Sequence, residues 1–479
     1  MRFLRLGWLA CLWLVGCAHL PESQVPPKPM SSVRLESTIT EYQALKGSGA
    51  WPNAQWWKAF GDSSLNKMEA EALSGNPTLE ETAARIRLAD AKVSQMSAAT
   101  GLNLSLDGSV NRQRLSENGL IPPPFSGSTV NFGNLAIDYS QDFDFWGLNK
   151  AKVAAARANL NAAIASEDEA RMLIAVSVAR TWFNLGRIDQ DLRLQYSYLK
   201  INRTQLALDE ALEKAGLESS LPVIDDKAKQ EALLSYLHVL EAQNEAGRYQ
   251  LAALVGRSPD AANMFSKASL PKNIAYGVPP TLPFDLLSRR ADIVELRDLI
   301  EASHSNVKAA QAAFFPNVNL SAMLGFQSIN LGSLVKSGNL ATSFGPAFNL
   351  PIFEGGALRA NLSASEASYE ENVAQYNQAV LNAAKQVAQA LSGLKSELSQ
   401  LEHAKLALVD ANDALNLAKY RYESGITDLS AELRAKENRI LAMRTVNSLE
   451  VGNFLAQLDL IKALGGGYQM PSAQTARKE

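Results

Sequence analysis

Residues 394–425 read LKSELSQLEHAKLALVDANDALNLAKYRYESG, and an apolar side chain returns there every seven residues. The side chains at this spacing are Leu394, Leu401, Leu408, Leu415 and Tyr422. Such a repeat predicts a long helix that supercoils against neighbouring helices. We therefore expect one continuous helix over about 356–425, packed side by side with others.

The same pattern occurs earlier in the chain, where Leu185, Leu192, Leu199 and Leu206 keep the seven-residue spacing. The chain thus contains an internal two-fold repeat. Its expected segments are a first repeat over 63–257, a connection over 258–282, a second repeat over 283–464 and a flexible tail over 465–479. Beyond 356–425, helices are expected over about 77–99, 147–214, 222–255, 286–314 and 429–464.

Each repeat also contains a stretch of period two. Leu102, Leu104 and Leu106 alternate with polar residues, which predicts a strand with one apolar and one wet face. Strand hairpins are therefore expected at about 101–143 and 317–353. Their individual strands should cover about 102–113, 130–143, 317–327 and 340–353.

The N-terminus predicts export. A basic start and a short apolar core, Leu6 to Val15, are typical of a signal peptide. The tetrad Leu14-Val15-Gly16-Cys17 resembles the bacterial lipobox, which makes 1–16 the signal and Cys17 the lipidated first residue, bearing acyl chains such as palmitate. Residues 17–62 should then be a tether and equatorial segment, and Ala18 carries no inner-membrane retention signal. The expected location is the outer membrane, with the helices in the periplasm.

Composition and spacing argue against several other classes of protein. Lysine plus arginine is 46 and aspartate plus glutamate 49, a balance that argues against nucleic-acid binding. The four histidines stand alone without metal-ligand spacing, and Gly465-Gly466-Gly467 lacks the context of a phosphate loop. We expect no enzyme, no metal and no cofactor beyond the lipid on Cys17.

The strands favour a membrane pore. A tilted strand of about twelve residues crosses roughly 30 Å, the thickness of a hydrocarbon core. Open sheet edges are not tolerated in lipid, and four strands cannot close, because the smallest such barrels have eight. Two copies would give eight strands and three would give twelve; small inward residues such as Ser105 favour three. The expected fold is therefore an α+β membrane protein, a trimeric 12-stranded β-barrel continued by an α-helical periplasmic tunnel.

Several motifs resemble the TolC-like outer-membrane factors, in particular the lipoprotein (NodT) family of efflux components. They are Trp56-Trp57-Lys58-Ala59-Phe60-Gly61-Asp62, Asn76-Pro77, Leu282 to Asp292 and Ala312-Ala313-Phe314-Phe315-Pro316. The resemblance implies a homotrimer that works with a periplasmic adaptor (membrane fusion protein) and an inner-membrane pump of RND type. Its expected cargo is drugs, toxic organics or similar small molecules, as in multidrug resistance.

The same resemblance places the tunnel's narrow periplasmic tip at the helix breaks. Candidate tip or gate residues are Tyr422, Gly425, Asp428, Ser430, Arg434 and Gly216. The family commonly narrows its tunnel with carboxylates or a leucine, whereas this chain has Ser430 and Arg434 there. The local sequence of Gly425 by itself indicates only a helix stop, so its gate role rests on the resemblance. Arg434 could line the constriction or lie on a solvated face.

Two further residue roles and two rival classes of protein stay open at the level of the sequence. Trp146 suits a membrane interface or simple packing, and Arg289-Arg290-Ala291-Asp292 suits a helix start or equatorial packing. A periplasmic coiled-coil adaptor or scaffold lipoprotein would share the helices but need no two-faced strands. A type I protein-secretion channel would share the fold and differ in cargo.

Overall fold

A computed structural model describes residues 27–31, 42, 51–268, 270–271 and 289–469. Two compact units are present, and each combines parts of both sequence repeats. The sheet unit contains Arg85–Ala163 and Leu296–Tyr376, and the core unit contains Met30–Ala84, Ile164–Glu295 and the chain from Asn377 onward. Cys17 lies outside the described residues.

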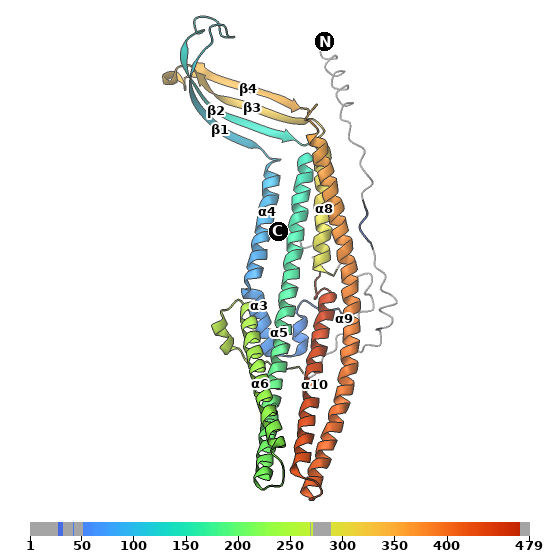
Figure 1. Ribbon diagram of the computed structural model, residues 1–479. Coiled ribbons are helices and arrows are strands. Elements are labelled where there is room, and N and C mark those ends of the chain that lie inside the picture. Colours follow the sequence, from blue (N-terminus) through green and yellow to red (C-terminus); the bar gives the residue numbers. More distant parts are fainter. Residues whose placement is uncertain (1–26, 32–41, 43–50, 269, 272–288, 470–479) are drawn as a thin grey trace. The chain divides into compact units, whose positions relative to one another are not determined.

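The elements follow the predicted order (Figure 1). The helices are α3 (Ser63–Gly75), α4 (Pro77–Ala98), α5 (Leu148–Lys214), α6 (Leu221–Leu254), α8 (Ala291–Ala312), α9 (Ala357–Glu423) and α10 (Leu429–Ala463). The strands are β1 (Asn103–Arg114), β2 (Thr129–Phe143), β3 (Asn317–Ser328) and β4 (Leu340–Asn349). Short 3-10 helices are η2 (Trp56–Phe60), η3 (Pro259–Met264), η5 (Leu331–Ser333) and η6 (Ser337–Asn339). The series α4-β1-β2-α5-α6 recurs as α8-β3-β4-α9-α10, which confirms the internal repeat.

Three boundaries differ from the sequence prediction. β4 ends at Asn349 instead of 353, and α8 begins at Ala291 instead of 286. The flexible tail was predicted to start at Gly465, but Gly465 and Gly466 are buried. Gly465 and Gly466 have positive φ, and a side chain at either would collide with Arg289 or Met172. These glycines are therefore a close-packed turn, required because only glycine fits there without strain.

The four strands of the sheet unit form one antiparallel sheet in the order β1-β2-β3-β4 (Figure 1). Each strand pairs with the next along the chain, with Leu104 opposite Tyr139, Ile137 opposite Leu324 and Ala322 opposite Phe344. β1 and β4 are the edges of the sheet.

The main hydrophobic core belongs to the core unit and explains the Trp56 to Asp62 motif. Trp56, Trp57 and Phe60 are buried, and the Phe60 ring lies 5.0 Å from that of Phe183. Asp62 caps α3 by accepting from the main-chain nitrogens of Ser64 and Leu65, and its other oxygen accepts from Trp182 Nε1 at 2.8 Å. The motif therefore has a structural role: its aromatic rings fill the core, and its aspartate caps the start of the next helix.

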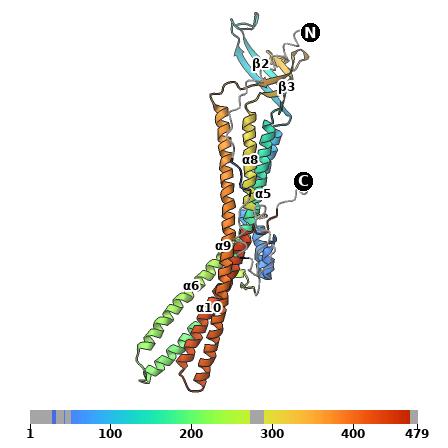
Figure 2. The same cartoon turned by 90° about the vertical axis from the view of Figure 1, so that its right-hand side faces the viewer.

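Two helix hairpins extend from this core. In Figures 1 and 2, α6 turns back along α5 and α10 turns back along α9. The predicted seven-residue seam of α9 is confirmed from Leu394 to Leu408: Leu394 and Leu401 are buried, and Leu401, Ala404 and Leu408 pack with Val446 of α10. Tyr422, the last residue of the predicted seam, is 40% exposed. On α5, Leu185 and Leu199 of the matching repeat are also buried.

The described parts of the N-terminal segment lie against α9. The Met30 main-chain nitrogen donates to Asn377 Oδ1 at 2.8 Å, and Lys395 Nζ lies 5.3 Å from the centre of the Tyr42 ring. Between these contacts α9 advances by eighteen residues, or about 27 Å at 1.5 Å per residue.

Candidate functional site

The sheet has two chemically distinct faces. Paired residues of an antiparallel sheet lie on the same face, so the registers assign every strand position. One face carries Leu104, Leu106, Val110, Leu135, Ile137, Phe143, Val318, Leu320, Leu324, Phe326, Leu340, Phe344 and Phe348. The other carries Asn103, Ser105, Asp107, Ser109, Asn134, Asp138, Ser140, Asp142, Asn319, Ser321, Gln327, Ser343 and Asn349. The predicted alternation is thus confirmed over most of the sheet. At the ends of β1 and β2 that face their connecting loop it breaks down, because Arg112 and Arg114 fall on the apolar face and Val130 and Phe132 on the polar face.

The apolar face is open in a single chain. Leu106 is 69% exposed and Phe344 78% exposed, which is unusual for large apolar side chains on a folded surface in water. The polar face holds three aspartates and no lysine or arginine. Such a sheet suits a wall between lipid and water.

Aromatic side chains gather where the strands meet the helices. Trp146 stacks on Phe315 with ring centres 4.7 Å apart, and its Nε1 donates to the Pro316 oxygen at 2.9 Å. Phe143 stacks on Phe145 at 5.8 Å. Trp146 is nonetheless 45% exposed, so it is packed on one side and open on the other, as interfacial aromatics are.

Both helix hairpins end in the same turn. Gly216 and Gly425 have φ of 69° and 71°. The Leu217 nitrogen donates to the Leu212 oxygen at 3.0 Å, and the Ile426 nitrogen donates to the Arg421 oxygen at 2.9 Å. This is the Schellman helix stop, in which glycine takes the left-handed conformation.

The other predicted tip residues have separate environments. Asp428 caps α10 by accepting from the Ala431 nitrogen at 3.0 Å, and Tyr422 and Arg434 are exposed. Ser430 accepts from Gln205 Nε2 of α5 at 3.0 Å. Of these residues, only Ser430 is seen to link one hairpin to the other.

Sequence reasoning missed the rest of that link. α10 faces the α5–α6 hairpin with Ser430, Glu437 and Arg444, spaced seven apart. Both Glu437 oxygens accept from Lys229 Nζ at 2.7 Å, and Arg444 donates to Gln195. We call these contacts the polar joint. Towards the C-terminal end of α10 the same seven-residue spacing continues with the buried apolar residues Val451 and Leu458.

The joint and the seam differ in how they can open. The α9–α10 seam has an apolar centre at Leu401, Ala404 and Val446 besides its hydrogen bond from Arg439 to Asn412, so separating it exposes hydrocarbon to water. The polar joint can exchange its hydrogen bonds for bonds to water at a lower net cost. Any movement at this end of the core unit is therefore expected at the polar joint, with each hairpin kept intact.

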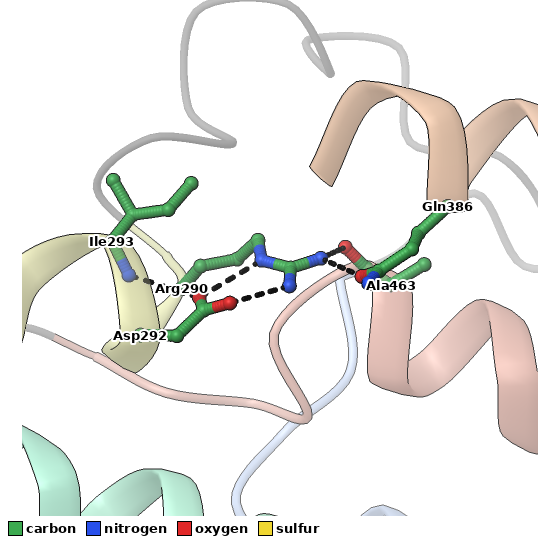
Figure 3. A network of polar contacts seen from close by, with 5 residues as sticks. All are labelled: Arg290, Asp292, Ile293, Gln386 and Ala463. Atoms are coloured by element: carbon green, nitrogen blue, oxygen red, sulfur yellow. Dashed lines mark hydrogen bonds and ion pairs between the residues drawn. The ribbon is translucent and has the colours of Figure 1, made fainter. Parts of the chain in front are cut away.

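A second polar cluster holds the core unit together (Figure 3). Buried Arg290 donates to both oxygens of Asp292 at 3.0 and 2.7 Å, to Gln386 Oε1 at 2.9 Å and to the Ala463 oxygen at 3.0 Å. The cluster joins α8, α9 and α10, and Asp292 lies in the first turn of α8, as expected of a helix start. Arg290 packs between the three helices. Burial, and then the nearby Asp292 carboxylate, raises the pKa of Glu169 to about 7.

Membrane-spanning helices and metal clusters are both missing from the described residues. None of the helices there is long and apolar enough to cross a bilayer. Over the same residues, no group of three or more His, Cys, Asp or Glu side chains is placed to hold a metal ion.

Comparisons with known proteins agree with this architecture. The profile of the family "Outer membrane efflux protein" matches residues 70–257 and 282–466. The chain is 29% identical to the multidrug resistance outer membrane protein MdtP of Escherichia coli K12, over 95% of this chain and 94% of that one.

Solved structures give the same result. The outer membrane protein VceC from Vibrio cholerae is 33% identical, with a TM-score of 0.80 over 88% of this chain and 100% of its own. The outer-membrane channel OprN is 25% identical, with a TM-score of 0.83 over 95% of this chain and 100% of its own.

Proposed function

Because the chain belongs to the outer membrane efflux protein family, we propose that three copies form an outer-membrane channel that exports drugs and similar small organic molecules. The observation that carries this proposal is the four-stranded sheet with one apolar and one polar face. In lipid such a sheet has to close, and three copies supply the twelve strands of a barrel with an open lumen. The relatives named as multidrug resistance proteins support the cargo class.

Self-association is supported by a second apolar stripe on α9. Leu406, Val409, Leu417 and Tyr420 are between 55% and 66% exposed. At 100° per residue they lie on the side of α9 opposite the seam. A second copy of the chain would cover this stripe.

The proposed channel is passive, and its partners follow from the family resemblance. A periplasmic adaptor and an inner-membrane pump of RND type supply the cargo and the energy. Cys17 carries the lipid that anchors the N-terminal segment. The polar joint, with Ser430 as one of its residues, is the proposed gate, and Gly216 and Gly425 are the turns that end its hairpins.

The test is conductance of the purified full-length protein in planar bilayers. Lys229→Met leaves the Glu437 carboxylate without its partner across the polar joint, and we expect it to raise the conductance several-fold. Substitutions at Ser430 and Arg434 that enlarge the tip should act in the same direction.

Lys227→Met is the matched control, because Lys227 pairs at 3.2 Å with Glu210 inside the α5–α6 hairpin. It should leave the conductance at the level of the unaltered protein. If neither the unaltered protein nor any opened variant conducts, the proposal of a channel is wrong. The protein is then better explained as a lipid-anchored scaffold without a pore.

A further inference from the structure

The β1–β2 hairpin extends beyond the rest of the sheet (Figure 1). β2 pairs with β3 only as far as Gly133, whereas its pairing with β1 continues to Thr129, opposite Arg114. Residues 129–132 therefore pair with β1 alone, over about 13 Å at 3.3 Å per residue. The other ends of these strands continue into α4 and α5. In the proposed channel those helices occupy the periplasm, so the projecting part of the hairpin lies at the outer surface.

The face that points to lipid in the main sheet becomes cationic on this projection. Val110 is the last apolar side chain of β1 on that face, and the next two positions are Arg112 and Arg114. Their cross-strand partners are polar: Arg112 lies opposite Asn131, and Arg114 lies opposite Thr129. All four of these residues are exposed. A small group of two guanidiniums, an amide and a hydroxyl thus directly follows the apolar band.

The height of the two arginines matches that of lipid head groups. A strand tilted by about 40° advances roughly 2.5 Å per residue along the membrane normal. The main chain of Arg112 therefore lies about 5 Å beyond Val110, and that of Arg114 about 10 Å beyond it. Cationic side chains at the end of an apolar band can extend into the polar region of the bilayer.

The β3–β4 loop adds apolar surface beside the arginines. A Cβ atom placed on Gly133 would lie 2.7 Å from Leu331 Cδ2 and 3.4 Å from the methyl groups of Leu334, so this loop covers the lipid-side face of β2 there. Gly133 is two residues from Asn131, the partner of Arg112. Leu331 remains 42% exposed. A lipid whose head group contacts Arg112 could therefore rest part of an acyl chain on Leu331.

The carboxylate nearest to these arginines is a weak competitor for them. Arg114 Nη2 lies 3.2 Å from Glu117 Oε1, and both side chains are 71% exposed. Ion pairs with this exposure contribute little and exchange readily. Within the described residues, Arg112 has no ion pair or side-chain hydrogen bond. Phosphate, in contrast, can accept two parallel hydrogen bonds from a guanidinium group.

We propose that Arg112 and Arg114, with Asn131 and Thr129 beside them, bind the phosphate groups of lipids in the outer leaflet. The lipid, instead of free phosphate, is the ligand because the site continues the lipid-facing band and adjoins exposed Leu331. Basic side chains at a membrane surface attract anionic lipids. This inference rests on the barrel of the proposed function and adds a specific lipid contact that fixes the height of the barrel in the bilayer.

The experiment is a titration of the full-length protein in detergent, in which native mass spectrometry counts the lipids bound per chain. The probes are lipid A with two phosphate groups and the same lipid with its phosphates removed. We expect the phosphorylated lipid to bind at least tenfold more tightly. The double variant Arg112→Gln/Arg114→Gln should lose this preference, and an equimolar amount of inorganic phosphate should not displace the lipid from the unaltered protein.

The matched control is Arg87→Gln/Arg157→Gln, which removes two exposed cations from α4 and α5. It should bind both lipids like the unaltered protein. The proposal is overturned if the Arg112/Arg114 variant keeps the preference or if the control loses it equally. It is also overturned if the two lipids bind alike, because the arginines then only face water, or if inorganic phosphate displaces the lipid.

Conductance separates this inference from the proposed function. The Arg112→Gln/Arg114→Gln variant should conduct like the unaltered protein in planar bilayers, because its substitutions lie on the lipid side of the wall. Lipid binding without conductance in the unaltered protein would contradict the channel and leave the lipid site. Conductance without a preference for phosphorylated lipid would do the reverse.

Discussion

Glu69 of α3 is fully buried in the core unit, and neither of its carboxyl oxygens has a hydrogen-bond partner within the described residues. Burial raises its pKa well above the usual value of 4.5. The folded chain therefore keeps the proton at pH values where the unfolded chain has released it. Stability contributed by this proton is complete below about pH 4.5 and is lost as the pH rises towards the folded-state pKa.

Glu69→Met should consequently stabilise the protein at pH 8 by about 1–3 kcal/mol, because it removes an unsatisfied buried group. The gain should shrink at pH 5, and thermal melting at both pH values measures it. Glu71→Met on the same helix is the control: it breaks the 3.0 Å ion pair with Arg257 and should not stabilise. Equal melting of Glu69→Met and the unaltered protein at pH 8 would refute the account.

At this scale the sequence predicts residues whose role is local. Gly216 and Gly425 were recognisable as helix breaks because each follows a long helical pattern. Lys229 and Glu437 were not recognisable, since each has its partner on another helix and no spacing within one helix marks them. Ser430 was selected through the family resemblance, and the structure adds its partner Gln205.

At the scale of the element, α9 has two apolar stripes with different partners. Leu401, 8% exposed, belongs to the seam with α10, whereas Leu406, 57% exposed, belongs to the opposite stripe. Leu401→Ala should destabilise the chain by about 2–4 kcal/mol through the cavity it leaves. Leu406→Ala should cost under about 0.5 kcal/mol in the isolated chain, where the side chain already faces solvent.

The outer stripe should instead govern assembly. Leu406→Glu combined with Leu417→Glu places charges where a second copy would pack, and we expect the fraction of trimer to fall at least tenfold. Light scattering after size exclusion measures the mass in detergent. If the fraction of trimer is unchanged, this stripe does not lie at the interface between copies of the chain.

Element boundaries were predictable where periodicity is strong. The seven-residue seam of α9 and the period of two in β1 both follow from the pattern of side chains. The end of β4 was not predictable, because Ile352 continues the even-numbered apolar positions of β4 after pairing stops at Asn349, and Phe353 prolongs the apolar segment. Both side chains are at least 90% exposed, so hydrophobicity alone misled the prediction.

At the scale of the whole molecule, the polar sheet face predicts charge selectivity in the proposed channel. Asp107, Asp138 and Asp142 would place nine carboxylates around the lumen of a trimer, with no lysine or arginine on that face. Cations should therefore pass more easily than anions, most clearly at about 10 mM salt, where the Debye length is about 30 Å.

The measurement is the reversal potential across a KCl gradient, using the Lys229→Met channel. Changing the three aspartates to asparagine should move the reversal potential towards zero. The control is Asp144→Asn, because Asp144 follows β2 and caps α5 by accepting from the Asn149 and Lys150 nitrogens. If the triple variant conducts with unchanged selectivity, the three aspartates are not the source of the selectivity. The proposal of a channel would still stand.

The number of copies was a deduction from closure and could not be read from one sequence. One chain supplies four strands with a lipid-compatible face, and such a sheet cannot have open edges in lipid. A closed barrel therefore needs more than one copy of the chain.

The two edges β1 and β4 have a further consequence for biogenesis. In a newly exported monomer, the edges of β1 and β4 each present a row of unpaired main-chain donors and acceptors beside the apolar sheet face. Either edge can pair with an exposed strand of another chain and so cause aggregation. Entry of a lone subunit into hydrocarbon is prohibitively costly. Subunits must therefore meet before or while they enter the bilayer.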